Sequence, residues 1–303
     1  MRVSLAGLLA CTLVLGHVVG AEHSGSGTRV VVLGTGTPNA DPERSGPAVA
    51  IIAGDQAYLV DAGPGIVRRA ALAARQDSIP TLAPDRLRRV FLTHLHSDHT
   101  TALPDLIVGA WVLGRTDPLD VYGPPGSRRM TALLEQAYSE DIEMRLHGGE
   151  PSNKTGFAAN AHDAAPGIVY RDSNVTVTAF EVAHGEWDHA YGYRFQTRDR
   201  TIVVSGDTRP TDAIVRACSG CDVLVHEVYS AERFAERPPA WQRYHAAFHT
   251  STTELADIAS RARPKLLVLY HQLYWGDDDD ALLRQVRSRY SGKVVSAHDI
   301  GVY

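Results

Sequence analysis

Short apolar runs separated by turn-forming residues alternate with longer, helix-like segments along this chain. Runs of about four to eight apolar residues are typical of buried strands, and longer amphipathic segments are typical of helices. In the first half, these patterns predict strands at residues 29–33, 48–53, 57–60, 90–93 and 120–122, and helices directly after 61–65, at 103–113 and at 126–138. Strands that alternate with helices favour an α/β fold.

The second half of the chain continues this alternation. It predicts strands at residues 175–182, 191–197, 201–205, 222–225, 265–270 and 294–297, and helices at 251–262 and 278–289. Residues 140–173 are rich in glycine, asparagine and aspartate, so we expect an irregular segment there. No repeat or low-complexity linker divides residues 28–303, and we therefore expect one domain over this range.

The first residues of the chain have the pattern of a secretory signal peptide. Arg2 precedes an apolar stretch over residues 5–19, and Gly20 and Ala21 supply small residues for cleavage. The stretch is shorter than the roughly 20 apolar residues of a membrane-spanning helix. We therefore expect a signal peptide at 1–21, a polar linker at 22–27, and a secreted or periplasmic mature chain without membrane attachment. A lipoprotein cleavage box at Cys11 is a weaker alternative.

The charge balance changes the expected choice of partners. The chain has 30 Lys and Arg against 35 Asp and Glu, and loss of residues 1–21 would remove only Arg2, taking the net charge from −5 to −6. Binding to nucleic acid depends on clustered Lys and Arg. We therefore expect a small substrate and no nucleic acid polymer as partner, while a homodimer stays open.

The cysteines indicate one short disulfide. Signal cleavage would remove Cys11 and leave Cys218 and Cys221. An even pair in an oxidising compartment favours a disulfide. Two free thiols are the alternative, and the sequence has no second CxxC that could complete a zinc ribbon.

Four side chains that can bind metal lie within six residues, at His94, His96, Asp98 and His99. They directly follow the strand expected at 90–93. Alternate residues at a strand end can aim two imidazoles at one point, and the following turn can direct Asp98 and His99 to a second point nearby. Burial of these groups without a metal would leave many of them unpaired, so this segment predicts a metal centre.

This HxHxDH pattern after a strand resembles the metallo-β-lactamase family. Further segments similar to the motifs of that family occur in the same order over residues 28–303. They are residues 34–38, 61–65, 182–185, 205–208, 225–228, 249–251 and 269–271. The last three are similar to the ribonuclease Z-like branch, whose secreted relatives include phosphodiesterases and arylsulfatases. The resemblance implies a four-layer αββα sandwich.

The resemblance also implies two divalent metal ions, each held by three side chains and joined by one carboxylate. The expected ligands are His94, His96 and His184 for the first ion, Asp98, His99 and His271 for the second, and Asp207 as the bridge. Imidazole and carboxylate ligands suit Zn²⁺, with Mn²⁺ or Fe as alternatives. Asp61 is expected to hydrogen-bond a ligand instead of binding metal. His189 is the alternative to His184, which we favour because it ends a strand before a glycine turn.

The same resemblance assigns Asp98, Glu227 and His249 to catalysis. In the ribonuclease Z-like branch, the residues that match Glu227 and His249 form a carboxylate–imidazole pair that protonates the leaving oxygen. The metals generate hydroxide as nucleophile, while a charged alkoxide still needs a proton to leave. A buried structural pair of Glu227 and His249 is the alternative.

Two departures from ribonuclease Z direct the expected choice of substrate. His184 and Asp207 lie only 23 positions apart, without room for the long arm with which ribonuclease Z grips tRNA. The expected export of the mature chain would also separate the enzyme from tRNA. We therefore expect a small anionic ester, either a phosphodiester or a sulfate ester. A lactonase or β-lactamase is the alternative. A tRNA 3′-processing endonuclease or a non-catalytic metal-binding module is less favoured, the latter because every expected ligand is present.

Overall fold

The computed structural model describes residues 27–303 of the chain. The signal peptide expected at residues 1–21 and residues 22–26 of the expected linker lie outside the described residues, so both predictions stay untested. Within residues 27–303, none of the helices is long and apolar enough to cross a membrane.

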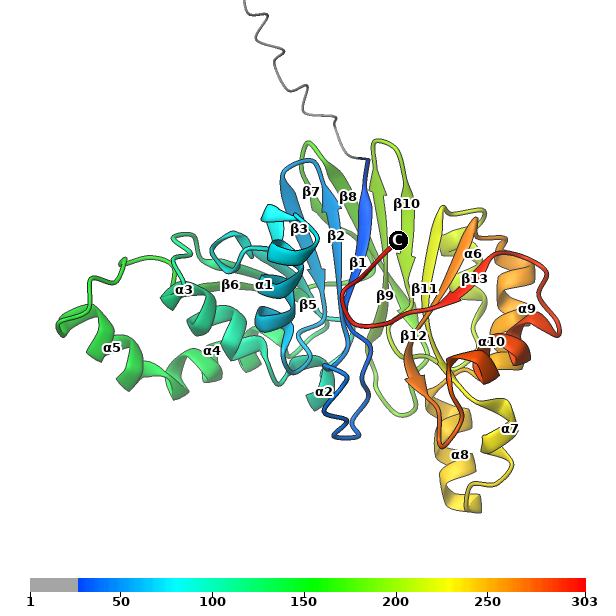
Figure 1. Cartoon of the computed structure of the whole chain (residues 1–303). Coiled ribbons are helices and arrows are strands. Elements are labelled where there is room, and N and C mark those ends of the chain that lie inside the picture. The colour runs from blue at the N-terminus through cyan, green and yellow to red at the C-terminus, as the bar shows by residue number, and fades with distance from the viewer. Residues whose placement is uncertain (1–26) are drawn as a thin grey trace, which may run out of the picture.

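Two seven-stranded sheets lie face to face at the centre of the molecule (Figure 1). The first sheet consists, in spatial order, of β14 (Gly301–Val302), β1 (Arg29–Gly34), β2 (Ala48–Ala53), β3 (Gln56–Val60), β4 (Arg89–Phe91), β5 (Leu119–Gly123) and β6 (Ala159–Asp163). The second consists of β13 (Val294–Ser296), β12 (Leu266–Leu273), β11 (Val223–Tyr229), β10 (Thr201–Val204), β9 (Ala190–Thr197), β8 (Val175–Val182) and β7 (Gly167–Arg171). Both sheets combine antiparallel and parallel strand pairs.

Helices cover the outer faces of both sheets (Figure 1), which confirms the predicted αββα sandwich. On the side of the first sheet lie α1 (Ile66–Gln76), α2 (Ser97–Thr100), α3 (Ala110–Val112), α4 (Ser127–Ala137) and α5 (Ser139–His147), with 3-10 turns at Pro80–Leu82 and Pro84–Arg86 and a π-helical turn at Asp105–Gly109. On the side of the second sheet lie α6 (Asp212–Cys218), α9 (Thr252–Ala262) and α10 (Asp279–Arg287). The helices α7 (Ala231–Phe234) and α8 (Pro239–Phe248) project from one end of the sandwich.

Three apolar layers hold these four layers of secondary structure together. In β1, Val31 and Leu33 pack toward the helices, whereas Val30 and Val32 pack between the two sheets. A third cluster, which includes Leu267, lies between the second sheet and its helices. A strand that is buried on both faces forms a continuous apolar run, which is why the sequence predicts such strands well.

The prediction of an irregular segment at 140–173 is wrong. This segment contains most of α5 and the two edge strands β6 and β7. Exposed and half-exposed residues make up both strands, because each has a neighbouring strand on one side only. Their sequences therefore lack the apolar run that marks a central strand.

One buried cation holds the segment between α2 and β5 in place. The helix predicted at 103–113 forms as one continuous helical run over 103–112, with the π-helical turn at Asp105–Gly109 followed directly by α3. Arg115, just after α3, is fully buried. Its guanidinium donates hydrogen bonds of 2.7 to 3.2 Å to the carbonyl oxygens of Leu87, Leu106, Ile107 and Gly156. Fixed protein acceptors thus satisfy four of its five donors.

The disulfide predicted between Cys218 and Cys221 is confirmed, with Cα atoms 4.7 Å apart. It closes the turn between α6 and β11. Both cysteines are buried in the cluster between the second sheet and its helices, so the bridge is part of the packed core.

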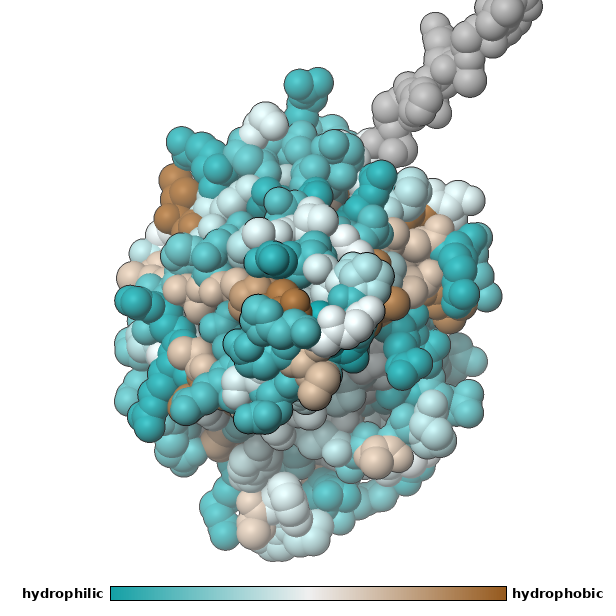
Figure 2. All heavy atoms as spheres, turned by 90° about the vertical axis from the view of Figure 1, so that its left-hand side faces the viewer, coloured by the Kyte–Doolittle hydropathy of each residue, from teal (hydrophilic) through white to brown (hydrophobic). Residues whose placement is uncertain are grey.

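The surface on the side of α3, α4 and α5 is mainly hydrophilic, with small and separate apolar areas (Figure 2). Leu113, Leu133 and Met144 are exposed apolar side chains on or next to these helices. Single exposed apolar side chains are normal for a folded protein. In the part of the chain that the structure describes, this face therefore carries no extended apolar surface.

Candidate metal centre

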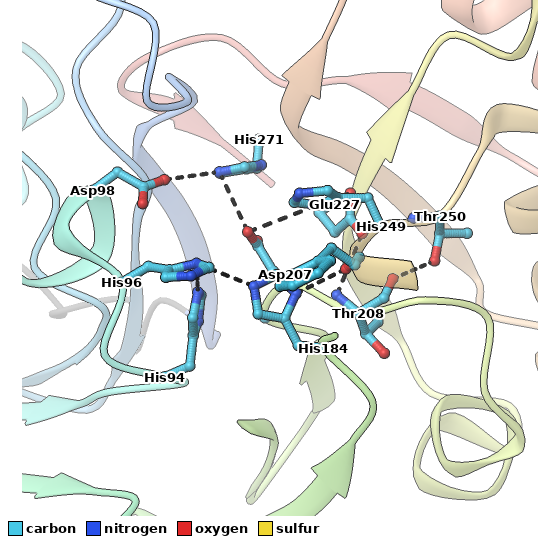
Figure 3. A network of polar contacts seen from close by, with 12 residues as sticks. His94, His96, Asp98, His184, Asp207, Thr208, Glu227, His249, Thr250 and His271 are labelled. Carbon is cyan, nitrogen blue, oxygen red and sulfur yellow. Dashed lines mark hydrogen bonds and ion pairs between the residues drawn. The ribbon is translucent and has the colours of Figure 1, made fainter. Parts of the chain in front are cut away.

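The first group of predicted ligands comes from one short segment after β4. His94 and His96 lie between β4 and α2, and Asp98 and His99 lie within α2. His94 and His99 are fully buried. The strand end and the single helical turn after it thus place all four side chains in one short segment, and Figure 3 shows Asp98 and His96 pointing toward His271 and His184.

The remaining predicted ligands come from the second sheet, one from each of three segments. His184 follows β8, Asp207 follows β10, and His271 lies in β12. The strands β10, β11 and β12 are parallel to one another, so their carboxyl-terminal ends lie at one edge of the sheet. All three side chains are buried at this edge, where they face the segment after β4 (Figure 3).

His94, His96 and His184 form the first cluster. The Nδ1 atom of His96 lies 3.1 Å from the Nε2 atoms of both His94 and His184. The ring nitrogens that face away from this cluster contact other parts of the protein. Nδ1 of His184 lies 2.8 Å from a backbone carbonyl oxygen. The indole N–H of Trp187 donates a hydrogen bond of 2.9 Å to Nε2 of His96. His189, the alternative to His184, is 43% exposed and lies beside Glu181 instead.

Asp98, His99 and His271 form the second cluster. The Oδ2 atom of Asp98 lies 3.2 Å from Nε2 of His271 and 3.4 Å from Nε2 of His99. Asp207 lies beside this cluster, with Oδ2 at 3.4 Å from Nε2 of His99. The hydrogen bond predicted for Asp61 is confirmed, because its Oδ2 lies 2.8 Å from Nδ1 of His99. Asp61 thereby orients the ring of His99 so that Nε2 faces the other acidic side chains.

The electrostatic environment differs between the two clusters. Burial lowers the pKa of His94 well below its usual value and that of His184 to about 3, so both imidazoles are neutral. Burial also disfavours the charged form of His99, but Asp207 and its neighbouring carboxylates raise its pKa well above the usual value. Burial alone would raise the pKa of Asp207, yet the positive charges of His271 and His99 hold it well below its usual value. The carboxylates therefore stabilise positive charge between them.

The buried polar atoms of the centre fit a divalent metal ion. Nε2 of His99 and Oδ1 of Asp207 are buried and have no hydrogen-bond partner among the described residues. Neutral imidazoles and carboxylates are the ligands that Zn²⁺ and similar ions bind. Donor atoms lie within 4.8 Å of one another in five sets of three, and two of these match the predicted division, His94 with His96 and His184, and Asp98 with His99 and His271. Two others include Asp207, and two include His249. The centre thus has the composition of a divalent metal site. The ligand role of each residue, the number of ions and their identity stay predictions.

Glu227 and His249 lie directly beside the two clusters (Figure 3). Glu227 is fully buried, and its Oε1 accepts hydrogen bonds from the backbone N–H groups of Thr250 at 2.9 Å and Thr208 at 3.3 Å. Its Oε2 lies 3.5 Å from Nδ1 of His249, and neither of these atoms has a hydrogen-bond partner among the described residues. Burial lowers the pKa of His249 to about 4 and raises that of Glu227 well above its usual value. The pair therefore retains one proton, although its use in catalysis stays a prediction.

A cavity of about 310 Å³ opens beside these side chains. Its lining includes His96, Asp98, Asp207, His249 and His271, together with Arg237, Trp241, Tyr244, His245 and Trp275. No sequence motif marks the second group of residues. The dense run of aromatic and histidine side chains at 241–249 is the one signal in the sequence that could have indicated them.

Comparisons with known proteins agree with this geometry. The model of the Beta-lactamase superfamily domain matches residues 56–272. Ribonuclease Z of Mycobacterium sp. (strain KMS) is 33% identical over 246 residues, which cover 80% of this chain and 84% of that protein. The structure of the metallo-beta-lactamase fold protein YhfI from Bacillus subtilis has a TM-score of 0.69 at 20% identity and covers 92% of this chain and 99% of its own. Human tRNase Z, short form, has a TM-score of 0.66 at 22% identity and covers 91% of this chain and 98% of its own.

These relatives correct one prediction. The expectation that no nucleic acid polymer is a partner is contradicted, because the relative that is 33% identical is a ribonuclease, named for its action on RNA. Net charge is a property of the whole surface and does not report the potential inside one cleft. The 23 positions from His184 to Asp207 contain β9 and β10, and the shortness of this connection does not decide which substrates reach the metal centre.

Proposed function

Because the chain belongs to the beta-lactamase superfamily and is a ribonuclease Z-like, metal-dependent hydrolase, we propose that it cleaves phosphodiester bonds. The position of His249 supports this proposal most directly. Its Nδ1 lies 3.5 Å from Oε2 of Glu227 and 3.8 Å from Oδ2 of Asp207, between a buried carboxylic acid and the metal centre. A proton donor at this place is useful when an alkoxide must leave. Attack on an acyl carbon depends more on stabilisation of the oxyanion.

We propose that the centre holds two divalent ions, most favourably Zn²⁺. The ligands would be His94, His96 and His184 for one ion, Asp98, His99 and His271 for the other, and Asp207 for both. When bound, the ions supply an activated water as nucleophile and positive charge for the phosphoryl oxygens.

The protein side chains would carry the proton transfers of the hydrolysis. The oxygen of water forms a bond to phosphorus while the bond between phosphorus and the leaving oxygen breaks. His249 donates one proton to the leaving oxygen and takes the proton of the Glu227 carboxyl in its place, which leaves Glu227 as a carboxylate. The proton that the attacking water loses returns through solvent to Glu227, so the pair starts the next cycle with its proton restored. Asp98 lines the same cavity and accepts the proton that the attacking water loses.

A substrate panel on the metal-loaded protein tests this proposal. The panel contains phosphodiesters, a precursor tRNA, a sulfate ester, a lactone and a β-lactam. We expect turnover of the phosphodiesters. His249→Ala should reduce the rate by about 10²- to 10⁴-fold for a ribose or alkyl leaving group. It should have a much smaller effect for p-nitrophenolate, which leaves without protonation.

The same variant separates the acid role from a ligand role. His249 lies close enough to Glu227 and His271 to form a further set of possible donors. If His249→Ala loses metal, or slows good and poor leaving groups equally, the acid role is wrong. Fast lactone hydrolysis without any phosphodiesterase activity would overturn the substrate class and leave the fold untouched.

We also propose that the mature chain is exported after cleavage near Ala21. The disulfide between Cys218 and Cys221 supports this, because disulfides persist in oxidising compartments. The intact mass of the protein purified from its own host tests the proposal. A chain that retains residues 1–21, or that accumulates only in the cytoplasm, would contradict it.

A further inference from the structure

One histidine of the metal centre differs from the others in how its ring is held. A histidine that binds metal through one ring nitrogen is usually oriented by a contact at the other nitrogen. Four of the five predicted histidine ligands have such a contact, namely His94, His96, His99 and His184. Nδ1 of His271 is buried and has no hydrogen-bond partner among the described residues. The position of this ring therefore depends on the backbone that carries it.

The backbone at His271 departs from regular strand geometry. Tyr270 and Gln272 pair with consecutive residues of β11, so His271 is one extra residue in β12. Its φ is 46°, and among the residues that the structure describes it is the one non-glycine residue with positive φ inside a strand. Such a bulge redirects a side chain, and a strained conformation persists only where surrounding contacts fix it. The bulge at His271 therefore requires contacts that hold it.

The side chain of Gln272, the residue after His271, provides the first of these contacts. It is buried, and its Nε2 donates hydrogen bonds to the carbonyl oxygens of Leu269 at 3.0 Å and Ala297 at 2.9 Å. These bonds tie the residues on both sides of the bulge to the end of β13. They also fix the orientation of the amide, so that its Oε1 can accept a hydrogen bond from a donor outside the sheet.

Arg44 supplies that donor from the loop between β1 and β2. Its guanidinium donates to both oxygen atoms of Gln272, to the backbone oxygen over 3.2 Å and to Oε1 over 2.5 Å. The same group donates to the hydroxyl and the carbonyl oxygen of Thr35, and lies 4.8 Å from the centre of the Tyr274 ring. A planar guanidinium can satisfy several acceptors in fixed directions, which a single ammonium cannot. Arg44 thus clamps the residue next to His271.

Asp299 fixes the loop that carries Arg44. Its carboxylate accepts hydrogen bonds from the backbone N–H groups of Thr35 at 2.9 Å and Ser45 at 2.7 Å, on either side of this loop. Arg69 of α1 lies 3.3 Å from the same carboxylate and donates to the hydroxyl of Ser45 over 2.7 Å. The loop is therefore closed at its base, and Arg44 connects it to β12.

We propose that Arg44 is a positioning residue, which acts through Gln272 to hold His271 toward Asp98 and Asp207 (Figure 3). Nε2 of His271 lies 3.2 Å from Oδ2 of Asp98 and 3.7 Å from Oδ2 of Asp207. Without the clamp, the bulge can relax to a less strained backbone, and this nitrogen then leaves the two carboxylates. The inference rests on the proposed two-ion centre and concerns the ion of the second cluster.

Titration of the chelator-treated protein with Zn²⁺ tests the inference. Calorimetry gives the Kd of each ion, and elemental analysis gives the number of ions per chain. For the unmodified protein, we expect two ions. In Arg44→Met, one ion should bind as before, and the Kd of the other should rise by about 10- to 100-fold, the usual effect of losing a contact that orients a ligand. Arg44→Lys should behave like Arg44→Met, because an ammonium keeps the charge but not the fork of donors.

Two further variants show whether Arg44 acts through Gln272. Gln272→Met should raise the same Kd, and the double variant should bind no more weakly than the weaker single variant, because both changes break one path. Arg69→Met is the matched control, since Arg69 contacts the same loop but not Gln272, and both Kd values should stay unchanged. The thermal midpoint without metal shows that each variant is folded. Arg44 is half-buried, so its variants carry the test if Gln272→Met fails to fold.

The outcomes distinguish this inference from the function on which it rests. If Arg44→Met binds both ions as tightly as the unmodified protein, or loses both equally, Arg44 does not position His271 and the proposed hydrolase stands. An equal loss in Arg69→Met, or additive losses in the double variant, would overturn the inference in the same way. If the unmodified protein binds fewer than two ions, the proposed two-ion centre fails and the inference fails with it.

Discussion

Two clusters of buried polar groups in this protein differ in how completely the protein satisfies them. Around Arg115, four carbonyl oxygens accept hydrogen bonds from one guanidinium. In the metal centre, several donor and acceptor atoms have no partner in the described chain, among them Nε2 of His99 and Oδ1 of Asp207.

This difference distinguishes a structural cluster, around Arg115, from a functional one, the metal centre. A buried polar group without a partner is costly, so proteins keep such groups only where something else pairs with them or uses them. In the Arg115 cluster, both terminal nitrogens are paired by the protein alone and only Nε lacks a partner among the described residues, and the cluster holds loops together. The metal centre is incomplete without a ligand. Four perturbations can break or sharpen this contrast.

The largest effect on activity is expected from substitution of Asp207, the proposed bridging ligand. Asp207→Ala should reduce turnover by at least about 10³-fold, because loss of metal removes several kcal/mol of transition-state stabilisation. The bound metal should fall in parallel, as measured by elemental analysis. Asp212→Ala is the control, since Asp212 is a nearby carboxylate with an exposed surface pair to Arg261. Full metal content in Asp207→Ala would show that Asp207 is no ligand.

The contrast also explains how much the sequence could predict. His94, His96, Asp98 and His99 are contiguous, so strand geometry and ligand chemistry alone predict a metal site there. The residues of the second sheet are far apart in the sequence, and only the parallel ends of β10, β11 and β12 bring them together. They were predictable solely through the resemblance to a family.

Other features could not be predicted because their causes are tertiary. The edge strands β6 and β7 lack apolar alternation since little of them is buried. Arg115 resembles any surface arginine in the sequence, and its burial depends on carbonyl groups from four separate positions. The aromatic side of the cavity likewise forms only because His245 of α8 packs against Trp275 in the folded chain.

The second effect is on stability. Arg115→Met should lower the free energy of unfolding by about 3–5 kcal/mol, because it leaves buried carbonyl oxygens without donors. Denaturant unfolding of the metal-loaded protein measures this. Metal content per folded chain should not change, since the two clusters are separate. Arg261→Met should cost less than about 1 kcal/mol, because Arg261 forms an exposed ion pair. An equally small cost for Arg115→Met would mean that water replaces the guanidinium easily.

The third effect is smaller and concerns metal removal. Chelation should lower the thermal midpoint by about 10 °C, because binding at 100 to 1,000 times Kd stabilises by about 3–4 kcal/mol and each kcal/mol shifts a protein of this size by about 2–4 °C. Without a cation, the carboxylates of Asp98 and Asp207 lie close together in a buried site. Chelator should have little effect on Asp207→Ala, which lacks the site already. A midpoint that does not respond to chelator in the unmodified protein would contradict the view that the centre is incomplete without metal.

The smallest effect is expected at His189, and it tests the assignment of the third ligand in the first cluster. Both His184 and His189 precede the same strand, so the sequence leaves the choice open. In the structure, His184 is fully buried and its Nε2 lies 3.1 Å from Nδ1 of His96, whereas His189 is 43% exposed. His189→Ala should therefore leave metal content and kcat/KM unchanged and alter stability by less than about 0.5 kcal/mol. His184→Ala, only five positions away, should lose metal and activity. A reversal of the two results would mean that the loop before β9 rearranges when metal binds and that His189 replaces His184 in the first cluster.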